Sequence, residues 1–324
     1  MTANSFEYQP TPPELPDLRI VARVSASDGE WARVQQLAAQ CNAAEGLDLK
    51  LARGALYAST SDMPPCAFLA YLGDARGEPG ALVGYCALDH GGDGESELCG
   101  MVAPEQRRRG IGRALYRAAL ASCRAQGVTR LLIVCEEASA SGRAFVATTG
   151  AQYDIGEHRM RLTGPELRAS VDPNGLTLES VQAGDTVAIE AIARIRAAAF
   201  DEPLDAARRH VLADLASPQE QFFLMRLAGD AEQPGEVTGE TIATAKISCE
   251  DQYAGIYAFA VAPARQGQGW GRRALALLVQ RLLAEGWTQI GLEVETTNAR
   301  AYALYTTSGF SAVTTYGYYV VALT

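Results

Sequence analysis

The sequence predicts an α/β (α+β) protein built from two tandem copies of one domain. Its 324 residues are too many for one ordinary hydrophobic core and suit about two domains. Residues of the first half recur in the second at a constant offset of 159 positions, as when Val102-Ala-Pro104 returns as Val261-Ala-Pro263. The same offset relates Gly127 to Gly286, Glu136 to Glu295 and Gly150 to Gly309. A register kept without a gap over this length indicates a duplication.

The second copy alternates strand-like and helix-like patterns. Its strand candidates are rich in β-branched and aromatic residues, and its helix candidates repeat apolar residues at helical spacing, as Leu275, Leu278 and Leu282 do. Glycine is common just past a helix C-terminus, so Gly286 suits the end of that helix. In order, we expect a strand at 176–182, helices at 186–200 and 204–216, strands at 221–228, 240–250 and 255–261, the helix that ends at Gly286, a strand at 290–295, a helix at 298–308 and two final strands within 311–323.

The first copy follows the same order. Its predicted elements are a strand at 20–24, a helix at 30–43, strands at 66–72, 81–89 and 97–102, a helix from Gly112, a strand at 131–137 and a helix at 141–148. Glycines and prolines interrupt the pattern over 163–175 and mark the boundary between the copies. We therefore expect a disordered, Pro-rich lead-in at 1–17, an N-terminal domain at 18–170 and a C-terminal domain at 174–324.

The composition predicts a soluble, cytoplasmic globular protein. Hydrophobic residues make up 48% of the chain and charged residues 20%. No apolar run approaches the roughly 20 residues that a membrane span needs, and the N-terminus lacks the basic patch and apolar core of a signal peptide. The seven cysteines include no C-x-x-C pair, which favours free thiols in a reducing compartment.

Charge and histidine content exclude two further classes of function. A net charge of −10 argues against nucleic acid as a partner, because phosphate backbones need a basic face. His90, His158 and His210 do not pair with cysteine at metal-ligand spacing, so we expect no metal site. The sequence is compatible with a monomer or a homodimer.

A glycine-rich stretch stands between a predicted strand and a predicted helix in each copy. The two read Arg107-Arg-Arg-Gly-Ile-Gly-Arg113 and Gln266-Gly-Gln-Gly-Trp-Gly-Arg272. Small residues at a helix N-terminus let successive backbone N–H groups converge, which suits a phosphate or pyrophosphate. A Walker loop is excluded because Gly-Lys-Ser/Thr is missing. A glycine-rich helix entry without a ligand is the plain alternative, but its recurrence with arginines in both copies favours phosphate.

The second stretch also fits the dinucleotide-binding pattern G-x-G-x-x-A, through Gly269, Gly271 and Ala274. Three observations count against that interpretation. The first copy has Leu115 at the third small position, the preceding strand ends early at Pro263, and only about 50 residues remain for a doubly wound sheet.

Two motifs together resemble the GCN5-related N-acetyltransferases, the GNAT family. Arg/Gln-x-x-Gly-x-Gly/Ala after a strand ending in Val-x-Pro is the family's acetyl-CoA signature and occurs in both copies. The second motif, N-x-x-A-x-x-L-Y-x-x-x-G-F, is complete from Asn298 to Phe310. The resemblance covers nearly the whole chain and implies two GNAT domains, each a mixed, mostly antiparallel sheet flanked by helices. The residues it implies for acetyl-CoA binding are Phe259, Ala260, Val261, Gln266, Gly267, Gln268, Gly269, Trp270, Gly271, Arg272 and Asn298, with Met101, Val102, Arg107, Arg108, Arg109, Gly110, Ile111, Gly112 and Arg113 in the first copy.

The first copy departs from the second motif. Against the motif's Asn, Ala, Leu, Tyr and Phe it has Ser139, Gly142, Phe145, Val146 and Ala151. A valine cannot serve as the general acid that the family's tyrosine supplies. Three roles remain open for this copy: nucleotide binding without turnover, a structural role, or catalysis with another acid. Glu95 and Glu97 are candidate bases there, or plain surface carboxylates on an edge.

The second copy contains candidates for both proton transfers. Acetyl transfer leaves a thiolate on CoA, and on the resemblance Tyr305 would protonate it. The attacking amine must first lose a proton, and Glu293, twelve residues before Tyr305, has the spacing of the base in the family's ribosomal-protein N-terminal acetyltransferases. The alternatives are a tyrosine that only packs in the core and a solvated glutamate at a strand end. The backbone of 259–261 would pair with the pantetheine arm, and an N–H near Val261 could stabilise the oxyanion.

The acceptor is not determined by these residues. Tandem members of the family with an active C-terminal half resemble mycothiol synthases, which acetylate a sugar–cysteine conjugate and take their base from a glutamate on the strand before the loop. The corresponding stretch here, GIYAFAV at 255–261, has no carboxylate. The acidity of the chain favours a cationic amine, and small-molecule and peptide amines both remain open. We expect an acetyl-CoA-dependent N-acetyltransferase; the alternative is a non-catalytic protein that senses acyl-CoA.

Overall fold

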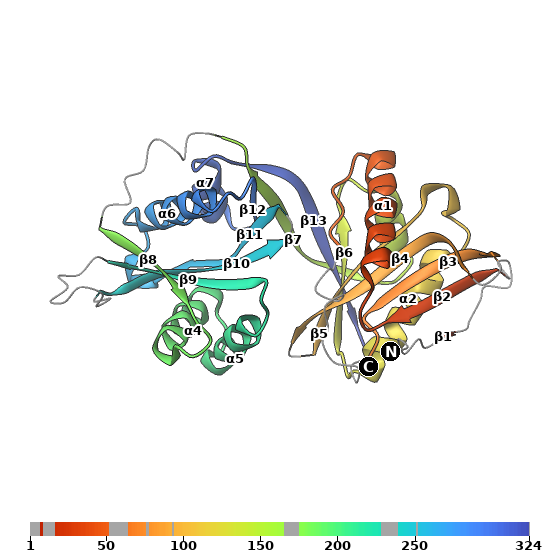
Figure 1. Ribbon diagram of the computed structural model, residues 1–324, viewed down its shortest axis with the longest axis horizontal. Helices are drawn as coiled ribbons and strands as arrows, with labels where there is room; N and C mark the ends of the chain where they lie inside the picture. The colour runs from red at the N-terminus through yellow and green to blue at the C-terminus, as the bar shows by residue number, and fades with distance from the viewer. Residues whose placement is uncertain are drawn as a thin grey trace. The chain divides into compact units, whose positions relative to one another are not determined.

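The computed structural model describes residues 7–8, 17–51, 64–75, 78–92, 94–164, 175–227, 239–250 and 252–323. Contacts divide the chain into two compact units (Figure 1). The first unit contains the chain up to Gly156 together with Thr314–Thr324, and the second unit contains Glu157–Val313. The end of the chain therefore belongs to the same unit as its beginning.

The first unit is a sheet in the order β1-β2-β3-β4-β5-β6-β13. All neighbouring strands are antiparallel except β5 and β6, which are parallel. Ser27 and Glu30 form a capping box at the start of the first helix, which ends at Gly46 in the left-handed conformation. The elements are β1 (Glu7–Tyr8), β2 (Leu18–Arg23), α1 (Asp28–Glu45), β3 (Ala67–Ala75), β4 (Glu78–Gly92), β5 (Glu95–Val102), a 3₁₀ turn (Pro104–Gln106), α2 (Ile111–Ala125), β6 (Arg130–Glu136), α3 (Ala140–Val146), the start of β7 (Gln152–Leu162) and the end of β13 (Phe310–Ala322).

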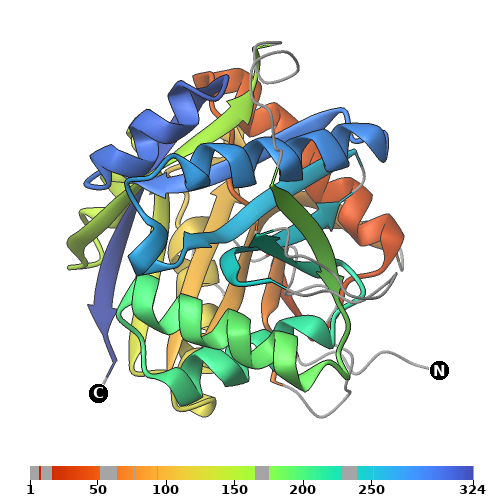
Figure 2. The same ribbon diagram turned by 90° about the vertical axis from the view of Figure 1, so that its left-hand side faces the viewer.

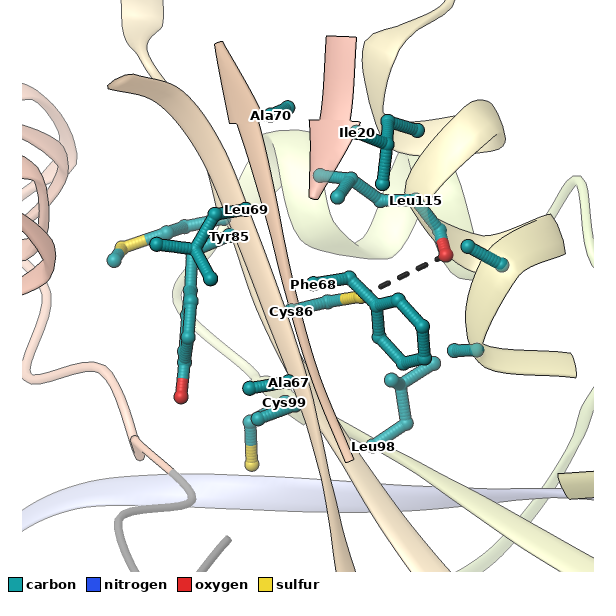
Figure 3. Packing of buried hydrophobic residues seen from close by; sticks show 14 of the residues in the cluster. Ile20, Ala67, Phe68, Leu69, Ala70, Tyr85, Cys86, Leu98, Cys99 and Leu115 are labelled. Atoms are coloured by element: carbon teal, nitrogen blue, oxygen red, sulfur yellow. Dashed lines mark hydrogen bonds between the residues drawn. The ribbon is translucent and has the colours of Figure 1, made fainter. Parts of the chain in front are cut away.

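Alternation along the strands of the first unit gives its sheet two apolar faces. Figure 3 shows Leu69 and Tyr85 on one side of β3 and β4, and Phe68 and Cys86 on the other side, toward Leu115 of α2. The Cys86 thiol donates to the Leu115 carbonyl at 3.6 Å. Successive residues of a strand point to opposite faces of the sheet. Because helices cover both faces, consecutive residues of β3 and β4 are apolar.

The second unit repeats this plan with the strand order β7-β12-β11-β10-β9-β8. Only β11 and β12 are parallel. Helices α4 and α5 cover one face of the sheet, and α6 and α7 cover the other (Figures 1 and 2). The elements are β8 (Leu176–Val181), α4 (Thr186–Phe200), α5 (Leu204–Leu215), β9 (Glu220–Leu227), β10 (Thr241–Glu250), β11 (Tyr253–Val261), a 3₁₀ turn (Pro263–Arg265), α6 (Trp270–Ala284), β12 (Gln289–Glu295) and α7 (Ala299–Thr306).

Each copy completes its sheet with a strand from the other. The last strand, β13, leaves the second unit after Val313 and pairs with β6 of the first unit, from Tyr316 opposite Glu136 to Ala322 opposite Arg130. Conversely, β7 begins in the first unit, and its second half pairs with β12 of the second unit. The last strand of each sequence copy therefore lies partly in the compact unit of the other copy.

The prediction of two strands in the tail is wrong. Residues Phe310–Ala322 form one strand, and Gly317 lies within it rather than in a turn. The glycine makes room for an aromatic ring, since an added Cβ would lie 2.9 Å from Cε2 of Tyr319. Strand β7, whose charged residues hide its pattern, was not predicted.

The predicted lead-in, 1–17, lies mostly outside the described residues, although Glu7 and Tyr8 pair with β2. The contact boundary after Gly156 falls inside the predicted N-terminal domain, 18–170, because of the strand exchange. The predicted ends of the two domains stay predictions.

Strand exchange makes the stability of the first unit depend on the C-terminal residues. Tyr318 is buried against Leu132 of β6, and its hydroxyl accepts from Lys50 at 2.7 Å. We expect Tyr318→Ala to cost about 3–5 kcal/mol, the usual range for a buried aromatic residue. Chemical denaturation measures this loss, with exposed Ala322→Ser as the control. Equal stability of the two variants would contradict this role for β13.

Candidate active site

The sheet of the second unit opens where its parallel strands part. Strands β11 and β12 pair from Tyr253 opposite Gln289 to Ile256 opposite Leu292. Beyond that point β12 continues alongside β7, whereas the rest of β11 has β10 as its only partner among the described strands. One edge of β11 over 258–261 therefore faces an opening within the sheet. Such an edge presents backbone N–H and C=O groups to any extended ligand that can lie along it.

A β-bulge lies on β11 at this opening. Thr244 pairs with Ala260 and Lys246 with Tyr257, so Ala258 and Phe259 together stand opposite Ala245. Ala258 has φ 46°, a left-handed conformation that is uncommon for a residue with a Cβ. Bulges of this kind bend a strand and redirect its groups, and they are enriched near active sites. The predicted residues Phe259, Ala260 and Val261 are thus on the edge of the opening.

The predicted phosphate loop follows directly. Gly267 and Gly269 have φ 77° and 84°, values that glycine adopts without strain. Helix α6 begins at Trp270, and no side chain among the described residues caps it at Gly269. Its first N–H groups and its positive end therefore remain available for an anion. The side chains of Gln266 and Gln268 fold back onto the carbonyls of Val261, at 3.0 Å, and Ala264, at 2.8 Å.

The other predicted residues of the second copy have identifiable contacts. Arg272 donates to Thr307 at 2.8 Å, and the Trp270 ring lies 5.0 Å from the Arg273 guanidinium. Gly271 lies against Leu304 and Val261, so the helix start contacts both α7 and β11. Asn298 caps α7 by accepting from the Ala301 N–H at 3.0 Å. The asparagine of this motif therefore also has a structural role, the capping of α7.

Tyr305 lies in the core between α7 and the sheet. Its side chain is 7% exposed and meets Phe310 edge-to-face, with 6.2 Å between ring centroids. Burial raises the pKa of the phenol to about 12. With this pKa the phenol is protonated at neutral pH, and because its hydroxyl makes no hydrogen bond to another described residue, it can donate to a ligand.

Glu293 lies on the opposite face of β12. Leu292 and Val294 belong to the same buried cluster as Tyr305, whereas Glu293 alternates with them and is half-buried. It stands directly opposite Arg159 of β7, whose guanidinium lies 5.5 Å from the Tyr253 ring. Arg159 was missed because β7 itself was not predicted.

The first unit has the same opening without the bulge. Strands β5 and β6 part after Leu98 and Ile133, but β4 and β5 keep one register from Gly84–Val102 to His90–Ser96. Val146, 4% exposed, occupies the position of the tyrosine. The two candidate bases are engaged in ion pairs, Glu95 with Arg130 at 2.6 Å and Glu97 with Lys50 at 3.5 Å.

The first loop is also less open. Arg107 donates to the Val102 carbonyl at 3.1 Å and binds the Glu45 carboxylate, while Arg109 donates to Gln106. Arg108 has φ 63° where the second copy has glycine. The remaining predicted residues flank the loop: Met101 is buried in β5, Gly110 precedes α2 with φ 88°, and Ile111, Gly112 and Arg113 form the first turn of α2.

The described residues also bear on the predictions about thiols, metal sites and membrane spans. All seven cysteines are free, and burial raises the pKa of Cys66, Cys123 and Cys135 to about 11, so these remain protonated thiols at neutral pH. In the part of the chain that the structure describes, no three His, Cys, Asp or Glu residues are grouped as metal ligands would be. None of the described helices has the length and apolar character needed to cross a membrane.

Comparison with known proteins decides the family. The sequence pattern of the acetyltransferase (GNAT) family matches residues 31–150 and, a second time, 189–310. This chain belongs to the acetyltransferase (GNAT) family. The predictions of a GNAT fold in two tandem copies and of an N-acetyltransferase are confirmed.

Curated relatives align with most of this chain. A mycothiol acetyltransferase of Clavibacter michiganensis subsp. michiganensis is 30% identical over 94% of this chain and 95% of its own length. One of Kineococcus radiotolerans is 34% identical over 74% of this chain and 78% of its own.

Solved structures show the same fold. A GCN5-related N-acetyltransferase from Sphaerobacter thermophilus has a TM-score of 0.70 at 16% identity and covers 95% of this chain and 96% of its own. A tandem GNAT protein from the clavulanic acid biosynthesis pathway has a TM-score of 0.66 at 18% identity, with 94% of this chain and 98% of its own covered.

The first test of this GNAT site is a side chain added at Gly271. An added Cβ would lie 3.5 Å from both Leu304 and Val261, so alanine fits, while the branches of valine must reach into the loop or its neighbours. We expect Gly271→Val to raise the acetyl-CoA dissociation constant at least about tenfold, or about 1.4 kcal/mol, and Gly271→Ala to bind nearly normally. Isothermal titration measures both. Normal affinity in a folded Gly271→Val protein would remove this loop from the acetyl-CoA site.

Proposed function

We propose that the chain transfers an acetyl group from acetyl-CoA to a primary amine of a small molecule or peptide, by direct attack in the second unit. The observation that carries this proposal is the opening between β11 and β12, with a bulge on its edge and an uncapped glycine loop at its end. Glu293 stands on β12 just beyond its last pair with β11, and Tyr305 belongs to the buried cluster that contains Leu292 and Val294 of the opposite face. A thioester within such an opening has its two proton-transfer groups on different sides, one toward the sulfur and one toward the incoming amine.

Acetyl-CoA fits the groups that this opening offers. The pantetheine arm has amides that pair like a strand, and the β11 edge over Phe259–Val261 lacks a strand partner on that side within the described structure. The pyrophosphate carries the negative charge that the loop from Gln266 to Arg272 and the α6 N-terminus would attract. A backbone N–H near Val261 would stabilise the oxyanion of the tetrahedral intermediate.

The reaction needs two proton transfers. The amine nitrogen attacks the thioester carbon after Glu293 has accepted its proton, directly or through water. The C–S bond then breaks, and the Tyr305 hydroxyl protonates the departing thiolate and regains its proton from solvent. The raised pKa of Tyr305 keeps its proton in place until the thiolate forms.

The relatives suggest the first acceptor to test. Those matched here carry the name mycothiol acetyltransferase, and by that resemblance the acceptor would be the cysteinyl amine of a sugar–cysteine conjugate. Strand β11 has no carboxylate, and its Gly255 lies under the ring of Tyr257, since an added Cβ would lie 2.4 Å from Cε2 of that ring. We therefore assign the base to Glu293 on the neighbouring strand.

A thiol-release assay with acetyl-CoA tests the proposal against a panel of amines. The panel contains a cysteine–amino-sugar conjugate, free amino sugars, an aminoglycoside, a polyamine and peptides. We expect CoA release that depends on one class of primary amine, with mass spectrometry showing an added acetyl group on nitrogen. Tight acetyl-CoA binding without release on any amine would favour an acyl-CoA sensor instead.

Replacing Tyr305 by phenylalanine removes only the proposed acid. The ring contact with Phe310 is kept, and no hydrogen bond to a described residue is lost. We expect near-normal acetyl-CoA affinity and a loss in kcat of about 10²-fold, the usual scale for a positioned acid. Tyr302→Phe, one turn earlier on α7, is the matched control and should keep the rate. A fully active Tyr305→Phe enzyme would mean that another group protonates the thiolate.

The base is tested by Glu293→Gln. We expect kcat/KM at neutral pH to fall by about 10²-fold or more, with part of the loss regained at high pH, where the free amine is already deprotonated. Glu295→Gln removes an exposed carboxylate from the same face of β12 and should have little effect. If the two variants behave alike over the whole pH profile, Glu293 is not the base.

A further inference from the structure

The opening in the first unit is crossed by the unit's own chain. Helix α1 ends at Glu45, and the residues near this end bind both strands that border the opening. On β5, the Val102 carbonyl accepts from the Cys41 thiol at 3.5 Å. On β6, the Glu136 carboxylate accepts from the Asp48 N–H at 2.9 Å. A backbone carbonyl of one bordering strand and a side chain of the other are therefore already bound by residues 41–48.

The Glu45 carboxylate holds the start of the glycine loop. It forms an ion pair with Arg107 and accepts from the Ser139 hydroxyl at 3.2 Å and from the Ser141 hydroxyl at 2.6 Å and N–H at 3.3 Å. Although burial alone would raise it, the pKa of Glu45 is lowered by its hydrogen bonds with Ser141 and by the Arg107 charge. An anion is thus already bound by the first arginine of the loop, and charge-assisted contacts of this kind are the strong ones.

Among the described residues of the second unit, the equivalent positions do not form this closure. Glu136 and Ser139 are each 4% exposed, whereas Glu295 and Asn298, 159 positions later, are exposed. Gln266, the equivalent of Arg107, is exposed and accepts from Arg300 at 3.0 Å. The acidic side chain that follows α4, Glu202, is bound by Arg196 at 3.1 Å and His210 at 3.2 Å instead.

We infer that the first unit takes no acyl-CoA, because Glu45 holds the first arginine of its loop and residues 41–48 bind both strands that border its opening, and that the protein binds one acyl-CoA, in the second unit. This inference rests on the proposed function for the identity of the ligand. Of the roles that the sequence left open for the first copy, it selects the structural one. The missing bulge and the non-glycine residue Arg108 in the left-handed conformation agree with a loop that is no longer adapted to a nucleotide.

Titration of the full chain with CoA, followed by hydrogen exchange, tests the stoichiometry. We expect one CoA per chain and slower exchange only in peptides that contain 258–272. Two CoA molecules per chain, or slower exchange at 107–113 as well, would overturn the inference. Absence of any CoA binding would instead contradict the proposed function, and a second measurement without ligand then decides about the closure.

That measurement follows the Ser141 amide in the ligand-free protein. Its N–H donates to Glu45, so we expect Glu45→Ala to speed its exchange at least about tenfold while the affinity of the second unit for CoA is unchanged. Glu105→Ala, which removes an exposed carboxylate next to the same loop, is the control and should leave the exchange unchanged. Fast exchange of Ser141 in the unaltered protein would show that the closure does not exist in solution.

Discussion

The parting of two parallel strands is the constraint on which the rest of the structure depends. A continuous sheet leaves no backbone group for a ligand, whereas β11 and β12 separate after four paired positions. On its other edge β12 pairs with β7 from Gly291 to Glu295, so β12 stays within the sheet where β11 leaves it. The α6 N-terminus and the glycine loop follow at the end of the same strand, so a backbone edge and a positive helix end are adjacent. The proposed chemistry uses both.

The two copies share one framework and differ at a few positions. Both keep the parting of strands, the Val-Ala-Pro strand end and the uncapped helix start. They differ in a few contacts: the bulge at Ala258, the tyrosine that Val146 replaces, and the carboxylate of Glu45. Each difference is local, and apart from the additional strand β1 in the first unit the sheet order is the same in both units. The proposed absence of chemistry in the first copy therefore needs no change of fold.

Sequence patterns were sufficient to predict the features that depend on residues close together in the chain. Helix α4 begins and ends where the apolar spacing predicted, and the glycine loops stand at the predicted junctions of strand and helix. Tyr305 was identified by a short motif, Asn298 to Phe310, that spans α7 and the turn after it. The comparisons confirm the family and the duplication, while the roles of Tyr305 and Glu293 stay proposals.

Features that depend on distant residues escaped prediction. The exchange of β7 and β13, the partner that Arg159 provides for Glu293, and the contact of Glu45 with Arg107 all join segments far apart in the chain. A strand rich in charged residues, such as β7, shows little alternation of apolar and polar side chains, so the sequence pattern does not predict it. A single sequence also does not determine the pairing register of two strands, so the position of the bulge on β11 could not be predicted.

The return of the last strand has a consequence for how the chain folds during synthesis. Thr314 bonds to Glu136 across 178 positions, and β6 lacks its antiparallel neighbour until those final residues leave the ribosome. Non-local pairing of this kind slows folding and leaves an unpaired strand edge exposed meanwhile. The half of the protein that is made first therefore finishes folding last.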